Sequence, residues 1–180
     1  MRVERLQSEF DLEVVYRHFP LHAETPDEGS TLEQLFEGRN IDIASAQERM
    51  KKLMADEGLP YGERSMTYNS RLAQELAAWA TTQANGQLIH NALFQAYFVE
   101  NINLANTENL LRITDQIELP KDQAEQALKE RRFRDEVDAD WQRSRELGIT
   151  GVPTFIAAGK GLVGAQPYEQ LASLVAAAQQ

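Results

Sequence analysis

One pattern in the C-terminal third of the chain restricts the fold more than any other. A helix is predicted to end at Gly148, and after a short turn Pro153 stands directly before the β-branched and aromatic run 154–156. Proline cannot donate a hydrogen bond to a strand ladder, so it is confined to edges, first positions and tight turns. We therefore predict a tight turn with a cis peptide bond between Val152 and Pro153, because ordered folds keep cis-proline for such turns.

The residues after this turn predict a hairpin and a closing helix. Strands are predicted at about 153–158 and 161–164, and the sequence Gly159-Lys160-Gly161 between them is typical of a hairpin turn. The last helix begins at Pro167, where a missing N–H costs little because the first N–H groups of a helix have no partner within it. The chain is therefore predicted to end as strand, strand, helix.

The rest of the sequence predicts one more strand and a long helical block. A short helix is predicted over 2–10, and alternating apolar and polar residues predict a strand over 12–19. Further helices are predicted over 31–37, 42–57, 69–83, 86–100, 106–117, 121–129 and 131–147. Strands that flank a block of helices indicate a sheet domain with an inserted helical subdomain. We place the core domain at 1–30 and 148–180, and the helical insertion with its connecting helix at 31–147.

The composition excludes several classes of function. The net charge is −10, and 28 carboxylates outnumber 18 lysine and arginine residues, which argues against binding to nucleic acid. No apolar run approaches the roughly 20 residues that span a bilayer, and residues 1–6 lack the apolar centre of a secretory signal. We therefore predict a cytoplasmic protein without membrane contact. The chain contains no cysteine, so it has no disulfide, zinc–thiolate site or thiol nucleophile of its own.

Several blocks of sequence, in order, resemble the DsbA-like thioredoxin-fold family and, within it, the FrnE-like branch. These blocks are Arg17–Leu21 with His22, Met66–Ser70, Ala96–Glu100, Arg145–Gly148, Gly151–Thr154 and Gly164–Pro167. The resemblance extends over nearly all of the chain. It implies an α/β fold, a thioredoxin-like sheet with an inserted α-helical subdomain, and the function of a thiol–disulfide oxidoreductase.

The first strand of that family and its Cys-x-x-Cys motif have no counterpart here, because Met1 falls inside the helix that follows them. The resemblance places this strand between the strands predicted over 12–19 and 153–158. Without it, buried backbone groups would stay unpaired at about 1–3 kcal/mol each, against a typical stability of about 5–15 kcal/mol. We expect the natural product to start upstream of Met1; a partner chain or a repacked segment are the alternatives. A sheet with unpaired strand edges can pair with another chain, so a homodimer is the assembly to test.

The resemblance implies a substrate groove and no catalytic residue. In the family the cis-proline loop lies beside the thiol pair, and the residue before the proline pairs with an extended substrate. Val152, Pro153 and Thr154 would therefore contact a peptide or a small molecule, and Asn69 would line the same groove. Read without the resemblance, Asn69 is suited to capping the helix that follows it. Neither a metal nor a cofactor is predicted.

The histidines and most aromatic residues have simpler interpretations. Three histidines occur without carboxylates at the spacing of metal ligands, so we interpret them as ordinary exposed or core residues: His18, His22 and His90. Aromatic residues at helical spacings of three and four are typical of a core: Trp79, Phe94, Tyr97, Phe98 and Trp141.

Three functions remain open at this point. The first is a thiol–disulfide oxidoreductase, whose reaction needs a thiolate that this chain lacks. The second is a glutathione-dependent isomerase or transferase of the kappa type; those relatives hold glutathione with a Gly-Ser-Asp stretch, where this chain has Gly164-Ala165-Gln166. The third is a non-catalytic thioredoxin-like binding module that uses the groove at Val152 and Pro153.

Overall fold

The computed structural model describes residues 2–179. The chain divides into two compact units, one formed by Met1–Leu21 with Asp140–Gln180 and the other by His22–Ala139. The domain limits inferred from the sequence, at residues 30 and 148, remain a prediction.

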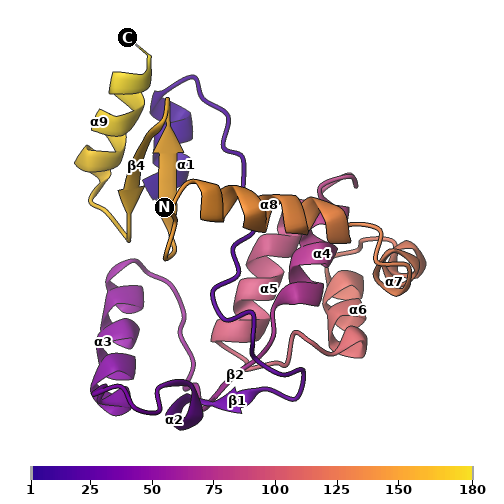
Figure 1. The fold of residues 1–180 in the computed structure, drawn as a ribbon. Coiled ribbons are helices and arrows are strands. Elements are labelled where there is room, and N and C mark those ends of the chain that lie inside the picture. The colour runs from indigo at the N-terminus through magenta and orange to yellow at the C-terminus, as the bar shows by residue number, and fades with distance from the viewer. Residues whose placement is uncertain (1, 180) are drawn as a thin grey trace. The chain divides into compact units, whose positions relative to one another are not determined.

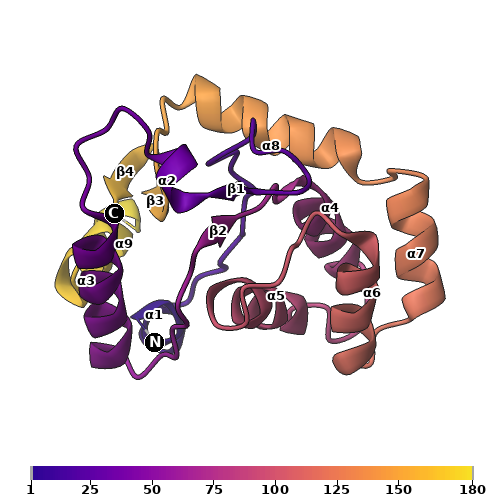
Figure 2. The same ribbon diagram turned by 90° about the horizontal axis from the view of Figure 1, so that it is seen from below.

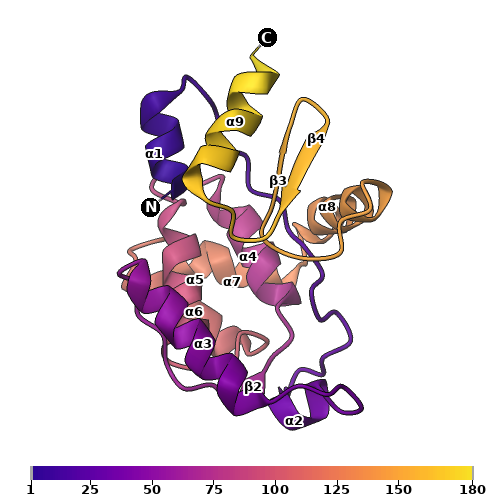
Figure 3. The same ribbon diagram turned by 90° about the vertical axis from the view of Figure 1, so that its left-hand side faces the viewer.

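The first unit is built on a hairpin. Strands β3 (Thr154–Ala157) and β4 (Lys160–Val163) pair antiparallel, and helix α9 (Tyr168–Ala178) packs along both of them (Figure 3). Helix α1 (Arg2–Glu9) packs in turn against α9 (Figure 1). The order strand, strand, helix at the end of the chain is as the sequence predicts.

Specific contacts attach α1 to the C-terminal segment. The Arg5 guanidinium carbon lies 3.7 Å from the centre of the Tyr168 ring, a cation–π contact. The Tyr168 hydroxyl donates a hydrogen bond to Glu9, and Arg2 Nη1 donates to the carbonyl of Gln166 at 2.9 Å. The first and last helices of the chain therefore belong to the same unit although most of the sequence separates them.

The hairpin closes through two residues in the left-handed region. Ala158 and Gly159 have φ values of 46° and 76° and connect the facing pair Ala157 and Lys160. Two successive positive φ angles form the type I′ turn that matches the twist of a hairpin. The turn thus begins one residue earlier than the predicted Gly159–Gly161.

The strand predicted over 12–19 is wrong. Residues 11–20 form neither helix nor strand. Alternating polarity fits one half-buried face of a sheet, but a strand exists only where a neighbouring strand provides the other half of the backbone ladder. Within residues 2–179, β3 pairs with β4 alone, so the sheet of this unit is a hairpin.

The second unit is a helical bundle with a short two-stranded ribbon. Its elements are β1 (Ser30–Thr31), α2 (Leu32–Leu35), α3 (Ile43–Asp56), β2 (Met66–Thr67), α4 (Arg71–Ala80), α5 (Leu88–Phe98), α6 (Thr107–Gln116) and α7 (Lys121–Lys129). Helix α7 packs against α4 and α6, and α5 packs against both as well (Figure 2). Leu76, Ile89 and Leu110 are fully buried in the resulting core. Helix α8 (Arg134–Glu146) runs from this unit into the first.

Polar caps explain where several of these helices begin. The side chains of Asp42 and Asn106 accept hydrogen bonds from the backbone N–H groups of Ser45 and Asn109, three residues along. Such caps satisfy N–H groups that have no partner within the helix. All the helices predicted from the sequence are present, while the two-residue strands β1 and β2 were not predicted because they are too short to show a period.

A buried carboxylate connects the helices of the second unit. Glu75 on α4 is 2% exposed and accepts two hydrogen bonds from Arg131 and one from Arg71, all at 2.6 Å. Arg71 also donates to Asp138 at 2.6 Å and to the carbonyl of Arg134 at 2.8 Å, both on α8. Burial raises the pKa of Glu75, but the hydrogen bonds from Arg131 and Arg71 outweigh burial and hold the pKa below its ordinary value. The residue is therefore a satisfied buried charge.

No helix within residues 2–179 has both the length and the apolar character needed to cross a membrane.

We predict that the Glu75 network contributes to stability above the ordinary carboxyl pKa of 4.5 and that this contribution is lost as pH falls through the lower pKa of the folded state. Replacing Glu75→Gln should cost about 2–3 kcal/mol of the free energy of unfolding at pH 7, because hydrogen bonds to charged groups are lost. It should also flatten the loss of stability on acidification. Urea unfolding between pH 3 and pH 7 measures both, and the exposed Glu33→Gln serves as the control, with a change within about 0.5 kcal/mol. Equal effects of the two variants would contradict the prediction.

Candidate functional site

The turn at Val152 and Pro153 joins α8 to β3 and is held on both sides. The peptide bond between these residues is cis. The carbonyl of Pro153 accepts a hydrogen bond from the N–H of Gly164 at 2.7 Å, and the Thr154 hydroxyl donates to the carbonyl of Gly151 at 2.7 Å. The first bond belongs to the hairpin ladder and the second closes the turn, so the turn has a defined position relative to β4.

Val152 is about half exposed and has unpaired backbone groups in the described part of the chain. The residue is 49% exposed. Within residues 2–179, neither its N–H nor its C=O takes part in a hydrogen bond. An extended ligand could therefore pair with this residue through backbone hydrogen bonds, as a further strand does.

The outer edge of β3 continues this set of free backbone groups. Phe155 faces Leu162, and the bond from Gly164 to Pro153 shows that Thr154 stands in a non-hydrogen-bonded pair with Val163. In an antiparallel pair such residues direct their N–H and C=O groups away from the partner strand. The backbone N–H and C=O groups of Thr154 and Ile156 thus point away from β4. In the described part of the chain no strand pairs with that edge of β3.

A histidine and an aspartate that the sequence did not connect lie together in the first unit. His18 Nδ1 is 2.9 Å from Asp140 Oδ2, the same oxygen accepts the backbone N–H of His18 at 3.0 Å, and Arg17 Nη1 donates to Asp140 Oδ1 at 3.2 Å. The side chains of His18 and Asp140 are 14% and 6% exposed. Because an ionised carboxylate only accepts, the ring donates its Nδ1 proton. The three bonds attach the segment before Leu21 to α8.

Sequence reasoning missed this pair because 122 residues separate His18 from Asp140. No motif spacing connects positions so far apart, and His18 was interpreted as an ordinary residue. Asp140 stands in a charge-rich helix, and nothing in the charge pattern distinguishes this buried carboxylate from the exposed ones around it.

Asn69 has a structural role in the second unit. Its Nδ2 group donates to the carbonyl of Thr25 at 2.7 Å and to that of Ala23 at 3.3 Å, while Oδ1 accepts the N–H of Arg71 at 2.9 Å. The helix cap itself is Ser70, whose side chain forms no capping bond. Val152, Pro153 and Thr154 belong to the first unit, so the groove predicted to contain all four residues remains a prediction.

The aromatic residues divide between core and surface. Trp79 is buried, and Tyr97 packs against the core with its ring edge-on to Phe98 at 4.9 Å. Phe94, however, is 59% exposed, which corrects the expectation that it belongs to the core. Helix α5 is apolar on several sides, so a spacing of three and four could not decide which face it buries.

The chemistry available to these groups is binding through hydrogen bonds. The chain has no thiol to attack a disulfide. Among residues 2–179, no group of three or more histidine, aspartate or glutamate side chains is arranged to hold a metal ion. What the first unit does offer is a defined turn, a free backbone edge and exposed apolar side chains.

A family model described as a DSBA-like thioredoxin domain matches residues 1–176. This chain belongs to that DsbA-like family. The match, the hairpin followed by α9 and the helical bundle together establish a thioredoxin-type fold with a helical insertion, in a family member without cysteine. A comparison with curated proteins finds none that matches the chain.

Solved structures share this DsbA-like fold at low sequence identity. The chain is similar to a "probable DsbA oxidoreductase" from Streptomyces coelicolor, with a TM-score of 0.87 and 24% identity over 99% of this chain and 82% of that one. It is similar to a 2-hydroxychromene-2-carboxylate isomerase, with a TM-score of 0.65 and 18% identity over 98% and 84%. The cytosolic disulfide reductase DsbM from Pseudomonas aeruginosa has a TM-score of 0.56 and 20% identity over 74% and 73%.

We predict that Asp140→Ala destabilises the protein by about 1–2 kcal/mol, because it removes the acceptor of the His18 backbone N–H and leaves a partly buried donor without its partner. Chemical unfolding at pH 7 measures the change. Asp11→Asn, an exposed carboxylate before the same segment, is the control and should change stability by less than about 0.5 kcal/mol. A neutral effect of Asp140→Ala would show that the three bonds are not significant for stability.

We also predict that His22 titrates below the ordinary histidine value. Burial lowers the pKa of His22, and the positive charges of Arg39 and then Arg64 lower it further. Removing the exposed charge with Arg39→Gln should raise the pKa, whereas Arg39→Lys should leave it low. Titration of the His22 ring protons by NMR distinguishes the two variants, and an identical shift for both would contradict the electrostatic cause.

Proposed function

We propose that this chain binds an extended peptide at Val152 and along the outer edge of β3, as the substrate-binding part of DsbA-like thiol–disulfide exchange. The observation that carries the proposal is that the N–H and C=O of the half-exposed Val152 take no part in hydrogen bonds within residues 2–179. Because the chain has no cysteine, the thiolate that exchange requires must come from a group outside these 180 residues.

The peptide would bind as an added strand. Backbone pairing provides affinity without selecting a sequence, and side chains at alternate positions provide the selection. Val152 and Ile156 are 49% and 43% exposed, so they favour apolar side chains in the ligand. We therefore expect a preference for extended segments with alternating apolar residues.

A glutathione-dependent function has less support. The segment that corresponds to the glutathione-holding stretch of the kappa-type relatives is occupied by bonds within the chain. Gln166 Nε2 donates to the carbonyl of Val163 at 2.5 Å, and the carbonyls of Ala165 and Gln166 accept from Arg2. Few polar groups are left there to bind a γ-glutamyl group.

Further proposals concern the branch of the family, the cellular location and the oligomeric state. We propose that the chain belongs to the FrnE-like branch and acts in the cytoplasm, supported by its sequence blocks and by a structural neighbour described as cytosolic. The open edge of β3 also supports a homodimer, which sedimentation at several protein concentrations would test.

We predict that a blocked, extended peptide with alternating valine and threonine shifts the amide NMR signals of Val152, Thr154 and Ile156. Val152→Pro removes the N–H donor and should weaken binding about tenfold, which corresponds to about 1.4 kcal/mol. Val152→Ala keeps the N–H and should weaken binding less. Equal losses in both variants, with folding verified by circular dichroism, would exclude pairing through the Val152 N–H.

A second measurement tests the absence of thiol chemistry. The purified 180-residue chain should not increase the rate of insulin reduction by dithiothreitol, since no thiolate is present to form a mixed disulfide. Turnover by the chain itself would overturn the assignment of a purely binding role.

A further inference from the structure

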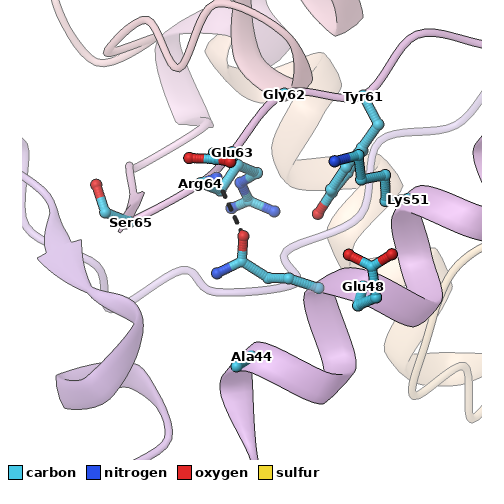
Figure 4. A pocket seen from close by; sticks show the side chains of 9 residues that line it. Ala44, Glu48, Lys51, Tyr61, Gly62, Glu63, Arg64 and Ser65 are labelled. Carbon is cyan, nitrogen blue, oxygen red and sulfur yellow. Dashed lines mark hydrogen bonds between the residues drawn. The ribbon is translucent and has the colours of Figure 1, made fainter.

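The second unit contains a cavity of about 470 Å³ that the peptide-binding proposal does not use. It lies between α3 and the segment that leads into β2 (Figure 4). Its lining residues are Ala44, Gln47, Glu48, Lys51, Tyr61, Gly62, Glu63, Arg64 and Ser65. The volume falls within the range of about 300–1,000 Å³ that is typical of small-molecule sites.

The wall formed by residues 61–65 is fixed by a close backbone approach. The N–H of Gly62 donates to the carbonyl of Phe98 at 2.9 Å. A Cβ atom at position 62 would lie 2.2 Å from the carbonyl oxygen of Val99, so only glycine permits this contact. The backbone N–H of Arg64 donates to Gln47 Oε1 at 3.2 Å, which connects this wall to α3 across the cavity. The cavity is therefore a product of specific contacts.

Arg64 is held in place but not neutralised. Its guanidinium carbon lies 4.5 Å from the centre of the Tyr97 ring and 5.3 Å from that of Phe98, and Nη2 donates to the Tyr97 hydroxyl at 2.8 Å. Within residues 2–179 it forms no ion pair, and its Nε has no hydrogen-bond acceptor. By contrast, Arg71 and Arg131 both pair with carboxylates. Arg64 thus has a fixed geometry and an unneutralised charge.

The other charged groups around the cavity are also unpaired. Lys51 provides a second positive charge, and Glu48 and Glu63 provide two negative charges, all as labelled in Figure 4. In the described part of the chain none of these three forms an ion pair. The lining is neutral overall, but its charges are separated. Glu48, Lys51 and Glu63 are exposed and Arg64 is partly buried. A simple anion would face two carboxylates and a simple cation would face Arg64 and Lys51, whereas a ligand with both signs can pair with both kinds of charge.

We propose that this cavity binds a small zwitterion of the dipeptide type, with its carboxylate toward Arg64 and Lys51 and its ammonium group toward Glu48 and Glu63. The Tyr61 ring, which stacks on Phe98 at 6.5 Å, provides an apolar wall for a side chain of the ligand. Ser65 and the amide nitrogen of Gln47 add hydrogen-bond donors. The cavity belongs to the second unit and the Val152 turn to the first, and this proposal does not depend on the function proposed for the turn.

The test uses the full chain and the dipeptide Gly-Phe with free termini. Isothermal titration calorimetry should detect saturable binding, and amide NMR signals of Gln47, Glu63 and Arg64 should shift. N-acetyl-Gly-Phe lacks the ammonium group and Gly-Phe amide lacks the carboxylate, so each should bind at least tenfold more weakly. Signals of residues 152–156 should stay unchanged, which distinguishes this site from the peptide-binding turn.

Two neighbouring lysines provide a matched pair of variants. Lys51 lines the cavity, whereas Lys52 lies next to it on the exposed surface of α3 and does not. Lys51→Ala should weaken Gly-Phe binding several-fold, and Lys52→Ala should leave it unchanged. Both side chains are exposed, so neither variant is expected to prevent folding.

Several results would overturn the proposal. No saturable binding up to about 10 mM would exclude a useful site. Equal binding of Gly-Phe and N-acetyl-Gly-Phe, or tighter binding of inorganic phosphate, would show a site for anions only. An equal loss of affinity in Lys51→Ala and Lys52→Ala would indicate nonspecific attraction to the surface of α3.

Discussion

Backbone hydrogen bonding in β3 is the constraint on which the first unit depends. One edge of this strand is satisfied by β4 through a register that runs from Thr154 opposite Val163 to Ala157 opposite Lys160. The other edge has no strand beside it in the described residues. Because unpaired backbone groups in a protein interior are costly, this edge has to be solvated or to accept another strand. The free N–H and C=O of Val152 extend the same edge into the turn.

Charge is used in two different ways in the second unit. Glu75 is buried, but it accepts hydrogen bonds from Arg71 and Arg131, so α4 is connected to the turn between α7 and α8 without an uncompensated charge. Arg71 also connects α4 to Asp138 on α8. Around the cavity the opposite holds, since Arg64, Lys51, Glu48 and Glu63 all line it, and within residues 2–179 none of them forms an ion pair. A satisfied network contributes to stability, whereas separated charges around a cavity are available to a ligand.

A member of the DsbA-like family can lack cysteine if this chain binds the substrate and another group supplies the thiolate. The family match covers nearly the whole chain, and the turn at Pro153 is held by bonds from Gly164 and within Gly151–Thr154 that involve no thiol. Such a turn can position an extended ligand through backbone contacts alone. The thiolate then has to be supplied by a group opposite the ligand, and the turn itself does not need one.

The sequence by itself determined most of the local structure and the classes of function that the composition argues against. Helix periods, caps such as Asn106 and stops such as Gly148 predicted the helices, and the β-branched run after Pro153 predicted the hairpin, because these signals depend on neighbours within a few residues. It also determined that no thiol is present. Only the tertiary structure showed that residues 12–19 form no strand, that His18 meets Asp140, and that Arg64 lines a cavity without a counter-ion. These features depend on which distant segment lies alongside, and no local pattern specifies that partner.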